Sequence, residues 1–85
     1  ARRQDSAINL CQQVEVMFVL GSRHSANTRE LANLCQRNGV ETHHLQNWEE
    51  FSPDFVKDKH RAGVTAGAST PDWIIEEFVE NLKAL

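Results

Sequence analysis

The chain has 85 residues, of which 40% are hydrophobic, and its formal net charge is -3. A mildly acidic chain lacks the basic footprint of a nucleic-acid-binding domain, and none of its apolar runs approaches the roughly 20 residues that a membrane-spanning helix needs. Two cysteines suggest neither a disulfide framework nor a complete metal site, so a reducing, cytoplasmic setting is expected.

The first predicted element is an amphipathic helix over residues 2–13. Its small and apolar residues recur three and four positions apart, which places them on one buried stripe. They are Ala7, Leu10, Cys11 and Val14. Cys11 is therefore expected to be a small core residue.

Residues 16–20 form a continuous apolar run, V-M-F-V-L, which is typical of a parallel strand covered on both faces. Gly21 follows the run and allows a sharp turn. Ser25, Asn27 and Thr28 then offer side chains that can cap a helix.

That helix is predicted over residues 26–38, with Leu31, Leu34 and Cys35 on one buried face. Gly39 stands just past its end, where a residue in the left-handed conformation is expected.

A second strand is predicted over residues 40–45. Asn47 and Glu50 then stand three residues apart, a spacing that resembles a capping box. Ser52 and Pro53 begin another short helical turn, with the proline in the first helical position.

The third strand is predicted over residues 61–65. A helix start is then predicted from three residues: Thr70 as a cap, Pro71 in the first helical position and Asp72 in the first turn. The last helix carries apolar residues at four-residue steps: Ile74, Phe78 and Leu82.

Helices and strands thus alternate along the chain, which implies a parallel sheet with right-handed crossovers. We predict one α/β domain over residues 1–85. It is a small three-layer domain with a parallel sheet of about three strands flanked by helices.

The loops after the first and third strands must open on the same side, because parallel strands end at one edge of a sheet, where ligands bind. Each loop leads into a helix start with small polar side chains. Such a start holds a phosphate or diphosphate through free N–H groups and the positive end of the helix dipole. The side chains are Ser25, Asn27, Thr28, Ser69 and Thr70. The alternative is that they only cap their helices.

The histidines do not form a site by spacing. His43 and His44 are adjacent in a predicted strand, so they point to opposite faces and cannot chelate one metal ion. His60 lies in a polar loop and is expected to be solvated. His24 lies in the first loop, where it either meets a phosphate as an imidazolium or is simply exposed. No nucleophile–base arrangement can be read from the spacing, so no catalytic residue and no metal ligand is predicted in this chain.

Two motifs carry a family resemblance. The chain reads G-S-R-H-S-A-N-T from Gly21 and G-V-T-A-G-A-S-T-P-D-W from Gly63. These stretches resemble the C-terminal part of 4-hydroxy-3-methylbut-2-enyl diphosphate reductase, the IspH/LytB family, which typically has G-S-x-x-S-S-N and G-V-T-A-G-A-S-x-P. The likeness covers nearly the whole chain, and Arg3 and Gln4 match the end of the family's C-x-A-T-x-x-R-Q motif.

The resemblance implies the C-terminal (third) domain of a larger cytoplasmic oxidoreductase of the non-mevalonate pathway of isoprenoid biosynthesis. Such an enzyme removes the hydroxyl of an allylic diphosphate by two-electron reduction and yields isopentenyl and dimethylallyl diphosphate. It uses a 4Fe-4S iron–sulfur cluster held by three cysteines, one per domain. The implied partners are the prenyl diphosphate substrate, two sister domains and a ferredoxin- or flavodoxin-type electron donor. The implied diphosphate-binding residues are Ser25, Ala26, Asn27 and Ser69.

The sequence departs from the family pattern in two places. The cluster-binding cysteine of the motif would lie just before Ala1, and neither Cys11 nor Cys35 occupies that position. Ala26 replaces the second serine of S-S-N, which removes a hydroxyl donor and keeps a backbone N–H. The chain alone is therefore expected to hold no cluster and to be inactive. The alternatives are a non-catalytic phosphate-binding α/β module and a structural docking domain.

Overall fold

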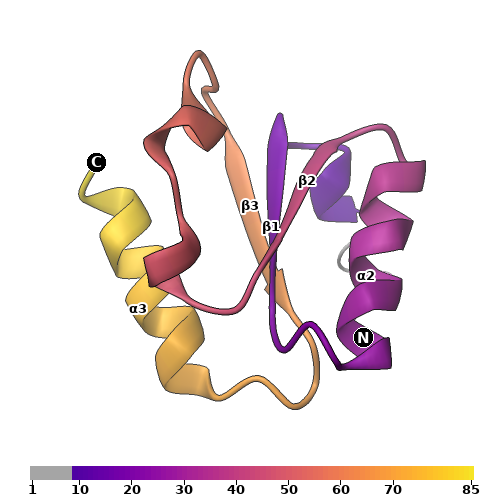
Figure 1. Ribbon diagram of the computed structural model, residues 1–85. Helices are drawn as coiled ribbons and strands as arrows, with labels where there is room; N and C mark the ends of the chain where they lie inside the picture. Colours follow the sequence, from indigo (N-terminus) through magenta and orange to yellow (C-terminus); the bar gives the residue numbers. More distant parts are fainter. Residues whose placement is uncertain (1–8) are drawn as a thin grey trace.

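A computed structural model describes residues 9–85 as a three-stranded parallel sheet with helices on both faces (Figure 1). Its elements are β1 (Val16–Leu20), α2 (Ala26–Arg37), β2 (Glu41–Leu45), the 3-10 helices η1 (Trp48–Glu50) and η2 (Pro53–Val56), β3 (Ala62–Ala66) and α3 (Asp72–Lys83). The predicted α/β class is confirmed, and the three strands differ from the predicted ranges by at most one residue at either end. Within this described part, no helix combines the length and the apolar character needed to cross a membrane.

The helix predicted over residues 2–13 is seen only at its end, where residues 9–11 are helical. Residues 2–8, which include Ala7 and the motif residues Arg3 and Gln4, lie outside the described part of the chain.

β1 is the central strand, and the strand order is β2-β1-β3 with both pairings parallel. The register is level from one strand to the next: Leu20, the last residue of β1, stands opposite Leu45 of β2 and Ala66 of β3. All three strands therefore end at one height, at the bottom of Figure 1, and α2 and α3 both begin there.

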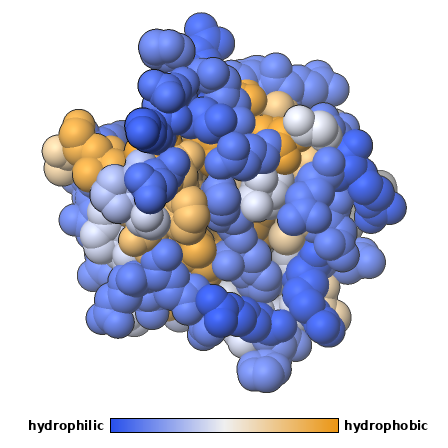
Figure 2. Space-filling view, turned by 45° about the horizontal axis from the view of Figure 1, so that its top comes forward, coloured by the Kyte–Doolittle hydropathy of each residue, from blue (hydrophilic) through white to orange (hydrophobic). Residues whose placement is uncertain are grey.

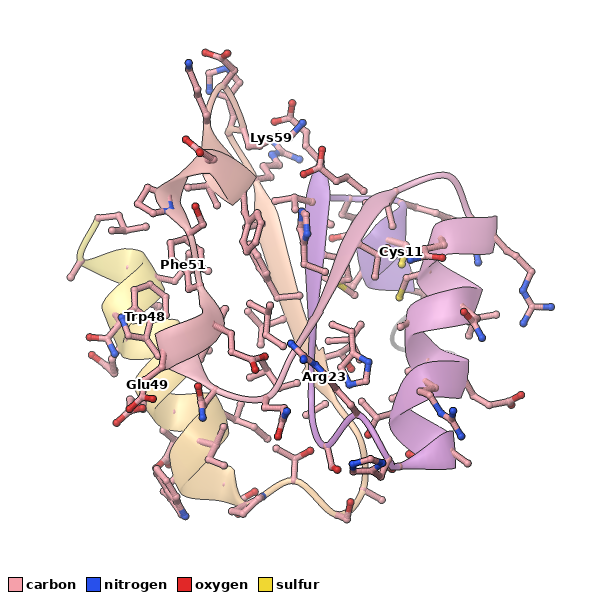
Figure 3. The ribbon with its side chains drawn as sticks, in the orientation of Figure 1. Cys11, Arg23, Trp48, Glu49, Phe51 and Lys59 are labelled. Atoms are coloured by element: carbon pink, nitrogen blue, oxygen red, sulfur yellow. The ribbon has the colours of Figure 1, made fainter. Side chains whose placement is uncertain are left out.

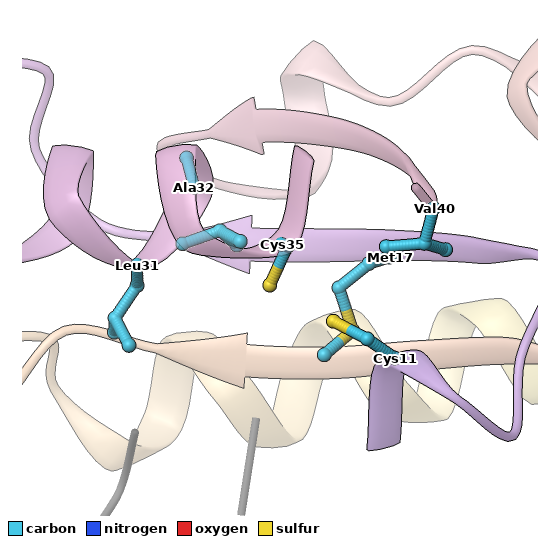
Figure 4. Close-up of a cluster of buried hydrophobic side chains, with 7 residues drawn as sticks. Cys11, Met17, Leu31, Ala32, Cys35 and Val40 are labelled. Atoms are coloured by element: carbon cyan, nitrogen blue, oxygen red, sulfur yellow. The ribbon is translucent and has the colours of Figure 1, made fainter. Parts of the chain in front are cut away.

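Alternate residues of β1 serve two separate hydrophobic clusters. Met17 and Val19 face α2, where they pack with residues of that helix and of the segment before β1 (Figure 4). That cluster comprises Cys11, Met17, Val19, Leu31, Ala32, Cys35 and Val40. Val16, Phe18 and Leu20 face the opposite way, toward α3. The sheet is therefore covered on both faces, as a three-layer domain requires.

Aromatic side chains dominate the cluster on the α3 face. The ring of Phe18 lies with its centroid 5.3 Å from Phe78 and 5.7 Å from Phe51, and Trp48 stacks on Phe51 at 4.3 Å. These distances suit aromatic pairs. Figure 3 places Trp48 and Phe51 on the segment between β2 and β3, over this face. The two 3-10 helices thus complete the cover that α3 begins.

Most predicted helix ends are confirmed. Ser25 caps α2, with its hydroxyl accepting from Thr28 N at 3.3 Å, and Gly39 adopts the left-handed conformation at φ +84°. Ser52 caps η2 through Asp54 N, with Pro53 in the first position.

Two expectations about helix ends are wrong. Thr70 does not cap α3, because its hydroxyl donates instead to Leu20 O at 3.0 Å and Pro71 takes the cap position with no side-chain bond. Glu50 completes no capping box, since its carboxylate accepts from Gln46 N. From α3, Ile75, Phe78 and Leu82 pack in the aromatic cluster.

Phe78 is fully buried in the aromatic cluster. Replacing it with alanine removes most of a buried ring, so Phe78→Ala is expected to lower the free energy of unfolding by about 3–5 kcal/mol. Glu77→Ala, at an exposed neighbouring position, is the control and should stay within about 0.5 kcal/mol of the wild type. Urea unfolding followed by circular dichroism makes the comparison, and equal midpoints for the two variants would contradict the packing.

Candidate functional site at the carboxyl edge of the sheet

The candidate site is formed where the three strands end and two helices begin. Backbone and side-chain hydrogen bonds tie the strand ends together: Gly21 N donates to Leu45 O at 3.0 Å and Gly67 N donates to Leu20 O at 3.1 Å. The Thr70 hydroxyl donates to the same Leu20 oxygen. The loop after β1 and the loop after β3 are therefore both anchored to the end of the central strand.

The two loops also contact each other directly. Asn27 Oδ1, in the first turn of α2, accepts a hydrogen bond from Ala68 N at 3.3 Å, across 41 positions of sequence. Because its oxygen faces Ala68, the Asn27 amide nitrogen keeps both of its N–H groups for a ligand. This bond brings the segment of Ser69 beside the start of α2, which is the juxtaposition that a shared anion site needs.

The four predicted binding residues differ in exposure. Ala26, Asn27 and Ser69 are exposed, whereas Ser25 is half-buried because it caps α2. A capping hydroxyl that accepts from a backbone N–H still has its own proton to donate. The hydroxyl of Ser25 can therefore cap the helix and bind an anion at the same time. The binding role of all four residues remains a prediction.

The two helix starts are electrostatically unequal. The first turn of α2 holds no acidic residue, whereas α3 begins with Asp72. A carboxylate offsets the positive end of a helix dipole. The start of α2 is thus expected to attract an anion more strongly than the start of α3. The loop before α3 would contribute mainly the Ser69 hydroxyl and backbone N–H groups.

Two residues of the first loop, Arg23 and His24, have defined surroundings. Arg23 forms an ion pair with Glu50 at 3.2 Å and is largely exposed, and Figure 3 places it at the carboxyl edge. His24 is exposed, and its backbone N–H donates to Ser22 Oγ at 3.1 Å. Contact between the His24 ring and a phosphate remains a prediction.

The other histidines lie as their spacing indicated. His43 stacks on Phe55 with 4.0 Å between ring centroids, on the α3 face of the sheet. His44 points to the other face, where its Nε2 is 3.0 Å from Gly21 O. The adjacent pair is therefore split between the two faces. The link from His44 to the glycine loop escaped the sequence analysis, because nothing in the spacing of these residues pairs them.

The expectation that Thr28 caps α2 is also wrong. Its hydroxyl finds no hydrogen-bond partner within residues 9–85 and the side chain is completely buried. Its position between the two loops was hidden in the sequence, where a threonine near a helix start reads as a capping residue.

The amino edge of the sheet has a different character. Figure 2 is turned so that this edge comes forward, and it shows mostly hydrophilic residues with apolar patches between them. A hollow of about 310 Å³ lies here between the start of β3 and the end of α3. It is lined by Val56, Lys59, His60, Arg61, Ala62, Leu82 and Leu85. The basic residues of this region thus lie at the other end of the strands from the candidate anion site.

The two cysteines do not suit the ligation of an iron–sulfur cluster. Both are buried, free thiols in the cluster beneath α2 (Figure 4). Burial, with a smaller contribution from a hydrogen bond with Cys11, raises the pKa of Cys35 to about 12. Clusters bind thiolates, which this environment disfavours. Among residues 9–85, no three histidine, cysteine or acidic side chains gather as a metal site.

The raised pKa of Cys35 predicts a protected thiol. At pH 8 its thiolate fraction should be far below the roughly one quarter that is expected in the unfolded chain. The contribution of this group to stability is complete below the unfolded pKa of roughly 8.5 and is lost as the pH rises toward 12. Alkylation with iodoacetamide at pH 8, followed by mass spectrometry of the Cys35 peptide, tests this protection. Equal labelling rates in native buffer and in urea would contradict it.

Comparisons with known proteins found matches that cover nearly the whole chain. The family model described as LytB protein matches residues 1–83. The chain is 45% identical to the 4-hydroxy-3-methylbut-2-enyl diphosphate reductase of Thermoanaerobacter sp. (strain X514), a match that covers 99% of this chain and 29% of that protein.

Solved structures agree with the sequence relatives. A structure of (E)-4-hydroxy-3-methyl-but-2-enyl diphosphate reductase, the terminal enzyme of the non-mevalonate pathway, matches with a TM-score of 0.93 and 37% identity over 98% of this chain and 30% of that one. The corresponding reductase from Plasmodium falciparum matches with a TM-score of 0.92 and 26% identity, over 95% and 26% of the two chains. The present chain thus spans about 30% of the length of these relatives.

Proposed function

We infer that this chain, which belongs to the LytB protein family, is the diphosphate-binding domain of a longer 4-hydroxy-3-methylbut-2-enyl diphosphate reductase. Residues 1–85 would form its C-terminal, third domain. The observation that carries the proposal is the hydrogen bond between Asn27 and Ala68, which joins the start of α2 to the loop before α3. The relatives' names supply the diphosphate, and a polar edge of this kind supports its assignment to this part of the chain.

The proposed mode of binding uses the residues of that edge in distinct ways. The start of α2 presents backbone N–H groups and the positive end of its dipole, which suit a phosphate. Ser25 donates its hydroxyl proton while it caps the helix, and Asn27 donates from the amide nitrogen that faces away from Ala68. Ser69 is exposed on the neighbouring loop and adds a second hydroxyl. Ala26 contributes its backbone N–H alone.

In the proposed reaction, the enzyme uses two electrons and two protons to remove the hydroxyl group at the far end of the substrate as water. Each substrate molecule becomes isopentenyl or dimethylallyl diphosphate. This domain would hold the diphosphate end, so that binding energy remote from the reacting carbon positions that carbon. Tight anchoring at one end therefore affects turnover as well as affinity.

We also propose an iron–sulfur cluster for the complete enzyme. Cys11 and Cys35 do not fit that role, because both thiols are buried in the core. The ligands would then lie outside residues 9–85. A ferredoxin- or flavodoxin-type protein would supply the electrons, and the cytoplasm would be the site of action, in agreement with two cysteines that remain free thiols.

Two sister domains are the remaining proposed partners. The large apolar side chains of Trp73 and Leu85 are 62% and 67% exposed, and apolar side chains exposed in this way are common at surfaces that pack against other domains. Trp73 lies next to the start of α3, so a domain covering it would also border the diphosphate site.

Asn27→Ala and Ser69→Ala test the proposed binding mode in the complete protein. A hydrogen bond to a charged group contributes about 1.5–3 kcal/mol, so each change is expected to lower kcat/KM about ten- to a hundredfold. Ala26→Ser should leave kcat/KM unchanged or raise it, because it adds a hydroxyl donor. Asn33→Ala, at an exposed position further along α2, is the matched control and should have no effect.

Steady-state reduction assays beside thermal melting make this measurement. If Asn27→Ala and Ser69→Ala both keep the wild-type kcat/KM in folded protein, the diphosphate assignment is wrong. A protein that binds diphosphate but reduces no substrate would instead indicate a non-catalytic phosphate-binding module.

A further inference from the structure

Thr28 is completely buried at the point where the two loops of the carboxyl edge meet. Glycines cover its hydroxyl from both sides. A Cβ added to Gly21 would lie 2.5 Å from Thr28 Oγ1, and one added to Gly67 would collide with the same oxygen. The hydroxyl therefore lies between the end of β1 and the end of β3, closed off by two residues that have no side chain.

The stability of this fold does not account for a threonine at this position. The Thr28 hydroxyl has no hydrogen-bond partner within residues 9–85. A buried hydroxyl without a partner destabilises the folded state, whereas valine would fill the same volume without that penalty. Buried polar groups left unpaired in this way require an explanation, and a functional one is available at this edge.

The surroundings of Thr28 link it to both halves of the site. Its backbone N–H donates to the capping hydroxyl of Ser25, and its neighbour Asn27 accepts from Ala68 on the other loop. The carbonyl oxygens of Gly21 and Gly67 each accept one hydrogen bond, from the His44 ring and from Thr70 N. Each of these carbonyl oxygens has a second lone pair that can accept another.

We propose that Thr28 is a positioning residue of the diphosphate site, whose hydroxyl donates to one of these glycine carbonyls when the two loops close on the bound anion. This inference rests on the proposed function. The unpaired hydroxyl makes the ligand-free site less stable than it would be with valine. Closure relieves that penalty, so the free energy of the new hydrogen bond adds to the affinity for diphosphate.

Thr28→Val and Thr28→Ser in the complete protein separate this role from a purely structural one. Calorimetric titration with inorganic diphosphate gives the affinity, and thermal melting without ligand gives the stability. Valine keeps the shape and removes the hydroxyl, so Thr28→Val is expected to melt no lower than the wild type and to bind diphosphate about tenfold more weakly. Serine keeps the hydroxyl, so Thr28→Ser should bind within about threefold of the wild type.

Thr42→Val is the matched control. Thr42 lies in β2, away from the two loops, and its hydroxyl donates to Val40 O at 3.0 Å. Removal of this hydroxyl should therefore lower the melting temperature and leave the affinity unchanged. Wild-type affinity in Thr28→Val overturns the proposal for Thr28 alone. A loss of affinity in Thr28→Ser as large as in Thr28→Val also overturns it, since the methyl group rather than the hydroxyl would then matter. A wild-type protein that binds no diphosphate refutes the proposed function itself.

Discussion

The complete burial of β1 between two parallel neighbours is the constraint on which the rest of this domain depends. All five of its side chains are inaccessible to solvent, and alternate residues supply the two clusters that hold α2 and α3. A shift of one residue would send each of these side chains to the wrong face, so the register is strongly determined. A fixed register makes the three strands end level, so the start of α2 and the loop before α3 meet at one edge of the sheet.

The fold followed from the sequence because its signals were local and mutually consistent. The apolar run of residues 16–20, the glycines near the ends of the first and third strands and the helical spacing around Leu31 all indicated the same alternation of elements. The error at Thr70 arose because its side chain has a partner far along the chain. Thr70 bonds to Leu20 rather than capping its own helix, and that bond spans 50 positions. No local pattern contains such information.

The candidate site was predictable in part, for the same reason. Parallel strands bring both loops to one edge whatever their details, so the proximity of the Ser25 and Ser69 segments could be expected. The contact between Asn27 and Ala68, the buried hydroxyl of Thr28 and the bond from His44 to Gly21 could not, because each depends on the packing of side chains in three dimensions. The assignment to diphosphate came from motif resemblance, since phosphate-binding and merely capping residues look alike in a single sequence.

The central claim is that the start of α2 and the loop before α3 form one anion site, and amide chemical shifts of the complete protein test it most directly. On titration with inorganic diphosphate, the amides of Ala26, Asn27 and Ser69 should shift together with a single dissociation constant. Amides at the amino edge of the sheet, such as that of Arg61, should not move. Shifts confined to the basic residues of the amino edge, or no shifts at millimolar diphosphate, would contradict the account.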